Sequence, residues 1–119
     1  MSKGELTEKR VQRMQHIAQH ITNVLRVKNP KYGESWKSRG GTSAFGNLDR
    51  KWSRLNTMVE EYDGDIFRAI RETADQPDGM LETLSDLMGY GMLVLEDQAD
   101  VVPLPNEYGS GLKPREDLP

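Results

Sequence analysis

Two carboxylates in the C-terminal half of the sequence are the first candidates for chemistry. Glu82 and Asp86 are four residues apart in a stretch with helical periodicity, so both side chains should project from one face of a helix. Asp86 also lies between Leu84 and Leu87, close to the apolar stripe, where a carboxylate has to be paired, hydrogen-bonded or bound to a metal. Such oxygen ligands suit Mg²⁺, which in turn binds substrate phosphates. The alternative is an ordinary exposed helix, on which acidic residues are common.

A basic cluster occupies residues 26–54. It sets eight cations against only Glu34 and Asp49, although the whole chain carries a net charge of -3. Ammonium and guanidinium groups beside the Gly40-Gly41 pair could bind phosphate oxygens, and the alternative is a solvated basic surface that balances the acidic half of the chain. The overall acidity argues against nucleic acid as a partner. The cations are Arg26, Lys28, Lys31, Lys37, Arg39, Arg50, Lys51 and Arg54.

Aromatic residues near these charges could contact a base. Tyr32 and Trp36 lie in the turn-rich segment between the first two expected helices and are the better candidates for stacking. Tyr90 falls one turn after Asp86, so its hydroxyl could reach the same site. Trp52 shares an apolar face with Phe45 in the second expected helix, and we expect it in the core.

The spacing of apolar residues predicts an all-α protein. No stretch alternates in strand fashion, whereas spacings of three and four recur along most of the chain. Pro30 should end the first helix, because the residue before a proline avoids the helical region. We expect an antiparallel bundle of four helices, one of them short, in a single domain over residues 1–98, followed by an extended Pro/Gly-rich tail over 99–119. The predicted helices cover about residues 5–27, 43–62, 66–73 and 80–98.

Composition excludes several classes of protein. Without cysteine the chain can form no disulfide, thiolate nucleophile or cysteine-ligated metal site. Its apolar runs are only a few residues long, so no segment should span a membrane, and a charged N-terminus argues against a secretion signal. We expect a soluble, cytoplasmic protein.

Three segments resemble the nucleotide modification associated domain 1 family, which is common in bacteriophages and is similar to the all-α, MazG-like nucleoside triphosphate pyrophosphohydrolases. The segments are residues 28–36 (KNPKYGESW), 50–55 (RKWSRL) and 82–90 (ETLSDLMGY). The resemblance implies an oligomeric enzyme of the host cytoplasm that cleaves (d)NTPs to NMP and pyrophosphate with Mg²⁺. Asp86 corresponds to the last aspartate of the second acidic motif of these enzymes, with Glu82 one turn before it.

The sequence departs from the MazG-like pattern at two acidic positions. Thr83 stands where those enzymes have a glutamate, and residues 50–54 (RKWSR) replace their first acidic motif. Exchanging metal-binding carboxylates for cations turns a Mg²⁺ site towards direct phosphate binding. The resemblance therefore supports nucleotide binding more strongly than hydrolysis.

Three functional hypotheses follow. The first is a Mg²⁺-dependent pyrophosphohydrolase, in which Glu82 and Asp86 act as metal-binding, catalytic residues. The second is a non-catalytic module that sequesters or senses a nucleotide, including a modified or cyclic one. The third is a structural helical homo-oligomer, with Gly89 and Gly91 permitting a close helix approach. In the first two, the candidate ligand-binding residues are Lys28, Lys31, Tyr32, Trp36, Arg39, Lys51, Arg54 and Tyr90.

Overall fold

The computed structural model describes residues 1–102, 104–109 and 111–112, and the described part contains helices and turns but no strand. The predicted all-α class is confirmed. None of the helices in the described part is long and apolar enough to cross a membrane. The helices are α1 (Lys3–Tyr32), α2 (Gly41–Glu60), α3 (Ile66–Glu72) and α4 (Met80–Gln98), with the 3₁₀ turns η1 (Ser35–Lys37) and η2 (Asn106–Tyr108).

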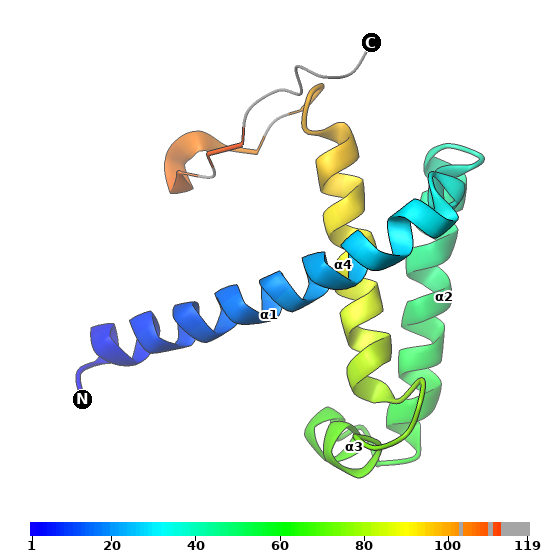
Figure 1. Cartoon of the computed structure of the whole chain (residues 1–119). Helices are drawn as coiled ribbons and strands as arrows, with labels where there is room; N and C mark the ends of the chain where they lie inside the picture. The colour runs from blue at the N-terminus through cyan, green and yellow to red at the C-terminus, as the bar shows by residue number, and fades with distance from the viewer. Residues whose placement is uncertain (103, 110, 113–119) are drawn as a thin grey trace.

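Helices α2 and α4 form the centre of the bundle. They lie side by side and run in opposite directions, and the short helix α3 lies across the end where the chain passes from one to the other (Figure 1). Helix α1 crosses over α4, and its N-terminal half projects away from the other helices (Figure 1). The site is therefore formed where the C-terminal half of α1 approaches the α2–α4 pair.

The core lies between α2, α3 and α4 and is small. Its buried members are Leu55 from α2, Ala69 from α3 and Met80 at the start of α4. Half-buried apolar side chains surround them, namely Met58, Val59, Tyr62, Ile66, Ile70, Leu84 and Leu87. Because so few side chains are removed from water, hydrophobic burial within one chain is modest.

A buried threonine joins α3 to α4. The Thr73 hydroxyl donates a hydrogen bond to the carbonyl oxygen of Ala69 at 2.7 Å and accepts one from the backbone N–H of Met80 at 3.0 Å. Gly79 at the N-cap position has no side chain that could satisfy the first N–H groups of α4, so Thr73 supplies this cap from the preceding helix.

The first helix is longer than predicted, because it continues past Pro30, the residue that was expected to end it. A proline removes one N–H and hence one hydrogen bond, here that of the Arg26 carbonyl, which lies at an exposed position close to the helix end. The helix ends at Gly33, which has a φ of 57° and donates its N–H to the Asn29 carbonyl oxygen at 2.6 Å. Tyr32 is consequently helical, and the connection to α2 is shorter than expected.

The expected core position of Trp52 is wrong. Its side chain is 53% exposed and that of Phe45 is 67% exposed, whereas α2 buries Ala44 and Leu55. The large apolar residues of α2 suggested one face as the buried face, but a different face of the helix packs against α4. Lys51 lies half-buried on this second face.

The segment after α4 was expected to contain no helix, and the described part of it contains only the 3₁₀ turn η2. Residues 100–102, 104–105, 107–109 and 111–112 are exposed. Residues 113–119 of the predicted tail lie outside the described part.

Candidate functional site

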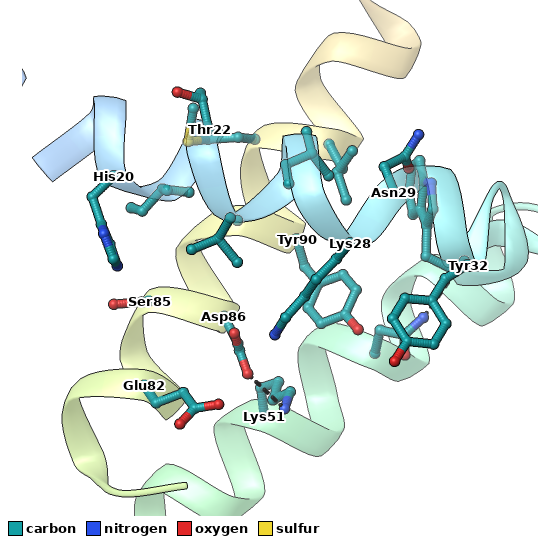
Figure 2. Close-up of a pocket in the computed structure, with 18 of the residues that line it drawn as sticks. His20, Thr22, Lys28, Asn29, Tyr32, Lys51, Glu82, Ser85, Asp86 and Tyr90 are labelled. Atoms are coloured by element: carbon teal, nitrogen blue, oxygen red, sulfur yellow. Dashed lines mark hydrogen bonds and ion pairs between the residues drawn. The ribbon is translucent and has the colours of Figure 1, made fainter. Parts of the chain in front are cut away.

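An open cleft of about 800 Å³ lies where α1, η1, α2 and α4 meet. This volume is in the range of small-molecule sites. Ile21, Val24 and Leu25 of α1 and Leu93 of α4 form its apolar wall. Polar and aromatic side chains line the rest, and several of them point into the same space (Figure 2).

The cleft brings together most of the candidate site residues. Seven of the ten line it, from segments up to about sixty positions apart in the sequence. Lys31, Arg39 and Arg54 are not among the lining residues, so their predicted role in this site is not supported by their position. The seven that line the cleft are Lys28, Tyr32, Trp36, Lys51, Glu82, Asp86 and Tyr90.

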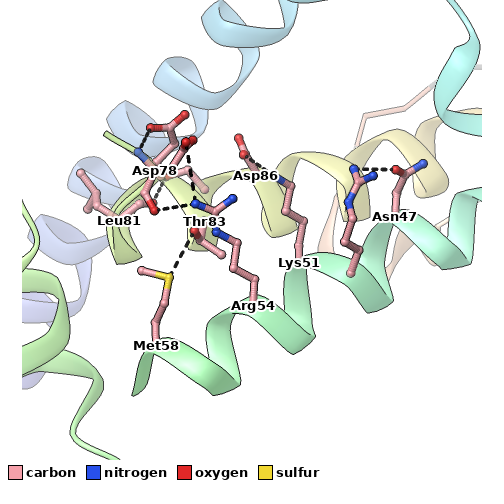
Figure 3. A network of polar contacts seen from close by, with 11 residues as sticks. Asn47, Lys51, Arg54, Met58, Asp78, Leu81, Thr83 and Asp86 are labelled. Atoms are coloured by element: carbon pink, nitrogen blue, oxygen red, sulfur yellow. Dashed lines mark hydrogen bonds and ion pairs between the residues drawn. The ribbon is translucent and has the colours of Figure 1, made fainter. Parts of the chain in front are cut away.

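An ion pair between α2 and α4 occupies one wall of the cleft. The Nζ atom of Lys51 donates to Oδ2 of Asp86 at 2.9 Å, and the two side chains are only 17% and 21% exposed (Figures 2 and 3). The sequence required a partner for a carboxylate so close to the apolar stripe, and Lys51 is that partner. Lys28 reaches from α1 towards the same pair, with the ring of Tyr90 beside it (Figure 2).

Glu82 and Arg54 both form hydrogen bonds with the turn between α3 and α4. Oε2 of Glu82 accepts a hydrogen bond from the backbone N–H of Asp78 at 3.1 Å. The Arg54 guanidinium donates to the carbonyl oxygen of Asp78 at 3.0 Å, and its Nη2 atom lies 3.8 Å from the Asp78 carboxylate (Figure 3). Arg54 therefore braces this turn from α2, which explains why it does not line the cleft.

A cluster of hydrogen bonds around Asn47 was not predicted from the sequence. Its amide nitrogen donates to the carbonyl oxygens of Trp36 at 2.8 Å and Ser43 at 3.1 Å, and its Oδ1 accepts from Arg50 at 3.0 Å. Asn47 and Arg50 both line the cleft. Spacing in the sequence could have identified Asn47, because it precedes Lys51 by one helical turn and lies on the same face of the helix.

A lysine fixes the segment that carries Trp36. Lys37 donates to the carboxylate of Asp97 in α4 and forms an ion pair with Glu34 at 3.1 Å. Its ammonium also lies 5.8 Å from the centre of the Trp36 ring, within the range of a cation–π contact. The hydrogen bonds to Asp97 and Glu34 raise the pKa of Lys37 above its usual value. Two contacts thereby hold Trp36: Asn47 bonds its carbonyl oxygen, and the Lys37 ammonium lies near its ring.

Glu82 and Asp86 are the two carboxylates that line the cleft. Mg²⁺ requires oxygen ligands that are free to coordinate. Asp86 is engaged by Lys51 and Glu82 by the Asp78 N–H, and within the described residues no group of three or more His, Cys, Asp or Glu side chains could hold a metal. The cation that balances Asp86 is Lys51 itself.

The charges of the cleft favour an anionic ligand. Three cations, Lys28, Arg50 and Lys51, stand against the two carboxylates. Comparisons with protein-family models, with curated proteins and with solved structures give no match to this chain. The assignment of a function therefore depends on the geometry and chemistry of the cleft.

Proposed function

We propose that the protein binds a nucleoside phosphate, such as a (d)NTP or a modified or cyclic nucleotide, in the cleft between α1, α2 and α4. One observation carries this proposal: a single cleft of about 800 Å³ gathers three cations and three aromatic side chains. Cationic side chains bind phosphate oxygens, and a nucleobase can stack on aromatic rings. The resemblance of residues 28–36, 50–55 and 82–90 to a phage nucleotide-modification family agrees with it.

The cations of the cleft are assigned to the phosphates. Lys28 from α1 and Lys51 from α2 approach the same space from opposite sides, and Arg50 lines it as well (Figure 2). A phosphate placed there would compete with Asp86 for the Lys51 ammonium. Charge-assisted hydrogen bonds of this kind contribute about 1.5–3 kcal/mol each, so loss of one should weaken binding roughly tenfold or more.

The aromatic residues are assigned to the base. Tyr32 is 66% exposed and lines the mouth of the cleft, so its ring is accessible to a ligand. Trp36 is held by the Asn47 and Lys37 contacts and is half-buried. Base stacking contributes about 1–3 kcal/mol for each base, which adds affinity without selecting one base strictly.

Hydrolysis is the second candidate function, because Glu82 and Asp86 line the same cleft as the cations. It ranks below binding because both carboxylates are engaged by protein groups. The proposal places the protein in the cytoplasm, where such nucleotides occur, and nucleic acid is not its ligand.

A nucleotide panel tests the proposal. Thermal shift and calorimetry with each common NTP and dNTP, in EDTA and in Mg²⁺, should detect stabilisation by at least one nucleotide without a divalent ion. Lys28→Ala and Lys51→Ala should weaken this binding about tenfold or more. Lys31→Ala is the matched control, because it removes the same charge from α1 three residues from Lys28 but outside the cleft.

Two results would contradict the proposal. If no nucleotide binds in either buffer, the cleft is not a nucleotide site. If binding and release of NMP occur only with Mg²⁺, the pyrophosphohydrolase of the first hypothesis is correct and the metal-independent module is wrong.

A further inference from the structure

Tyr90 places a polar group in the cleft that forms no bond to the described part of the chain. Its side chain is half-buried on α4 and lines the cleft, with its ring beside Lys28 (Figure 2). Among the described residues none forms a hydrogen bond with the Tyr90 hydroxyl, and this hydroxyl is not sealed from the cleft. A phenol hydroxyl both donates and accepts hydrogen bonds, and most half-buried tyrosines have a partner. A ligand in the cleft can supply that partner.

The register between α2 and α4 fixes the level of Tyr90 in the bundle. The two helices run in opposite directions (Figure 1), and Lys51 of α2 bonds to Asp86 of α4. Asn47 lies four residues before Lys51, which is about 6 Å along α2. Tyr90 lies four residues after Asp86, which is about 6 Å along α4 in the same direction. Asn47 and Tyr90 are therefore at the same level, one helical turn from the ion pair.

Trp36 lies beyond this level, on the side away from the ion pair. Its carbonyl oxygen accepts a hydrogen bond from Asn47 at 2.8 Å, and the next residue, Lys37, donates to Asp97. Asp97 follows Tyr90 by seven residues, about 10 Å farther along α4. The Trp36 segment is thus held between the level of Tyr90 and that of Asp97. Tyr90 consequently lies between the ion pair and Trp36.

Helix α1 crosses α4 at the level of Tyr90. Ile21 is buried, and its Cγ2 atom lies 3.6 Å from the position that a Cβ atom would take at Gly89, the residue before Tyr90. Lys28 follows Ile21 by seven residues and so lies on the same face of α1. Figure 2 shows the Lys28 ammonium and the Tyr90 hydroxyl pointing into the same part of the cleft. The hydroxyl is therefore close to a cation that is assigned to phosphate.

We infer that Tyr90 contacts the sugar of the bound nucleotide and makes the cleft prefer ribonucleotides to 2′-deoxyribonucleotides. The inference rests on the proposed function, in which the cations hold the phosphates and Trp36 stacks on the base, because the sugar joins these two groups. The 2′ hydroxyl adjoins the carbon that carries the base, whereas the 3′ hydroxyl adjoins the carbon that leads to the phosphates. Tyr90 lies on the base side of the ion pair, so the 2′ hydroxyl is the nearer one.

Calorimetry in EDTA measures this preference. ATP, GTP, CTP and UTP are each compared with their 2′-deoxy and 3′-deoxy forms. A nucleotide that binds should lose about tenfold in affinity without its 2′ hydroxyl and about twofold or less without its 3′ hydroxyl. Equal or tighter binding of the 2′-deoxy form, or a larger loss without the 3′ hydroxyl, would overturn the inference and leave the proposed function intact. If none of these nucleotides binds, the proposed function fails and the inference fails with it.

Tyr90→Phe tests the residue, because it removes the hydroxyl and keeps the ring. It should weaken binding of the ribonucleotide about tenfold, to the level of the 2′-deoxy form, and change the affinity of the 2′-deoxy form by about twofold or less. A general loss of stability would weaken both forms alike, so the ratio of the two affinities reports the contact itself. Tyr62→Phe is the matched control, because it removes a hydroxyl from a half-buried tyrosine outside the cleft and should leave the ratio unchanged. A preference for the ribonucleotide that survives Tyr90→Phe would contradict the inference.

Discussion

The Nζ atom of Lys51 lies 2.9 Å from Oδ2 of Asp86, although the two residues are 35 positions apart. This ion pair joins α2 to α4 across the wall of the cleft. It explains why a carboxylate is tolerated beside the apolar stripe of α4. The pair thus links the stability of the bundle to the electrostatics of the proposed site.

Removing either member of this pair should destabilise the fold. Lys51→Met leaves Asp86 without its cation, and Asp86→Asn leaves Lys51 without its anion, so each should lower the free energy of unfolding by about 1–2 kcal/mol. The double variant should lose less than the sum of the two, with a coupling of about 1 kcal/mol. Urea denaturation of all four proteins measures this.

An exposed ion pair of the same protein provides the comparison. Arg68 and Glu72 lie four residues apart on α3, with their closest atoms 3.3 Å apart and both side chains about half exposed. Their coupling should be about 0.5 kcal/mol or less, because water screens the pair. Equal coupling in the two cycles would contradict a special role for Lys51 and Asp86.

Thr73 should be the most sensitive polar residue of the core. Thr73→Val keeps the shape of the side chain but leaves the buried N–H of Met80 without its acceptor. We expect a loss of about 1–3 kcal/mol in the free energy of unfolding. Thr57→Val is the control, because the Thr57 hydroxyl bonds only to the Ser53 carbonyl on an exposed surface. Similar losses for both variants would show that Thr73 does not cap α4.

Substituting alanine for two glycines of the α4 region, Gly79 and Gly91, should change the stability of the protein in opposite directions. A Cβ at Gly79 would lie 2.5 Å from the carbonyl oxygen of Thr73, so Gly79→Ala must displace backbone and should cost about 2 kcal/mol or more. A Cβ at Gly91 meets nothing within 4 Å, so Gly91→Ala should stabilise α4 by about 0.5–1 kcal/mol. Thermal unfolding of the two variants measures both changes. A destabilised Gly91→Ala variant would mean that Gly91 makes a close contact in an assembly.

The local elements of this fold were predictable from periodicity, and the bounds of α4 at Met80 and Gln98 agree with the prediction. Periodicity failed where an end or a face depended on the rest of the molecule. Pro30 did not end α1, because near a helix terminus a proline removes only one hydrogen bond. Trp52 is exposed because packing against α4 turned Lys51 inward, which apolar spacing within α2 alone cannot indicate.

The candidate site was predictable in composition but not in its pairing. Residue types and spacing identified Lys28, Lys51 and Asp86, all of which line the cleft. They could not show that Lys51 and Asp86 bond to each other, because that depends on the register between two helices. For the same reason the sequence could not show that the Arg54 guanidinium donates a hydrogen bond to the Asp78 carbonyl oxygen.

Alkaline pH should reveal the contribution of Lys37 to the fold. Its hydrogen bonds to Asp97 and Glu34 raise its pKa above 10.5 in the folded state. A raised lysine pKa stabilises the folded protein fully below pH 10.5, and this stabilisation is lost as the pH rises through the folded pKa. The difference in the free energy of unfolding between wild type and Lys37→Met should therefore be constant from pH 8 to 10 and shrink above pH 10.5. Urea titrations across this range measure it, with Lys31→Met as the control for the general effect of alkali. A difference that stays constant to pH 11.5 would mean that the charge of Lys37 does not hold η1 against α4.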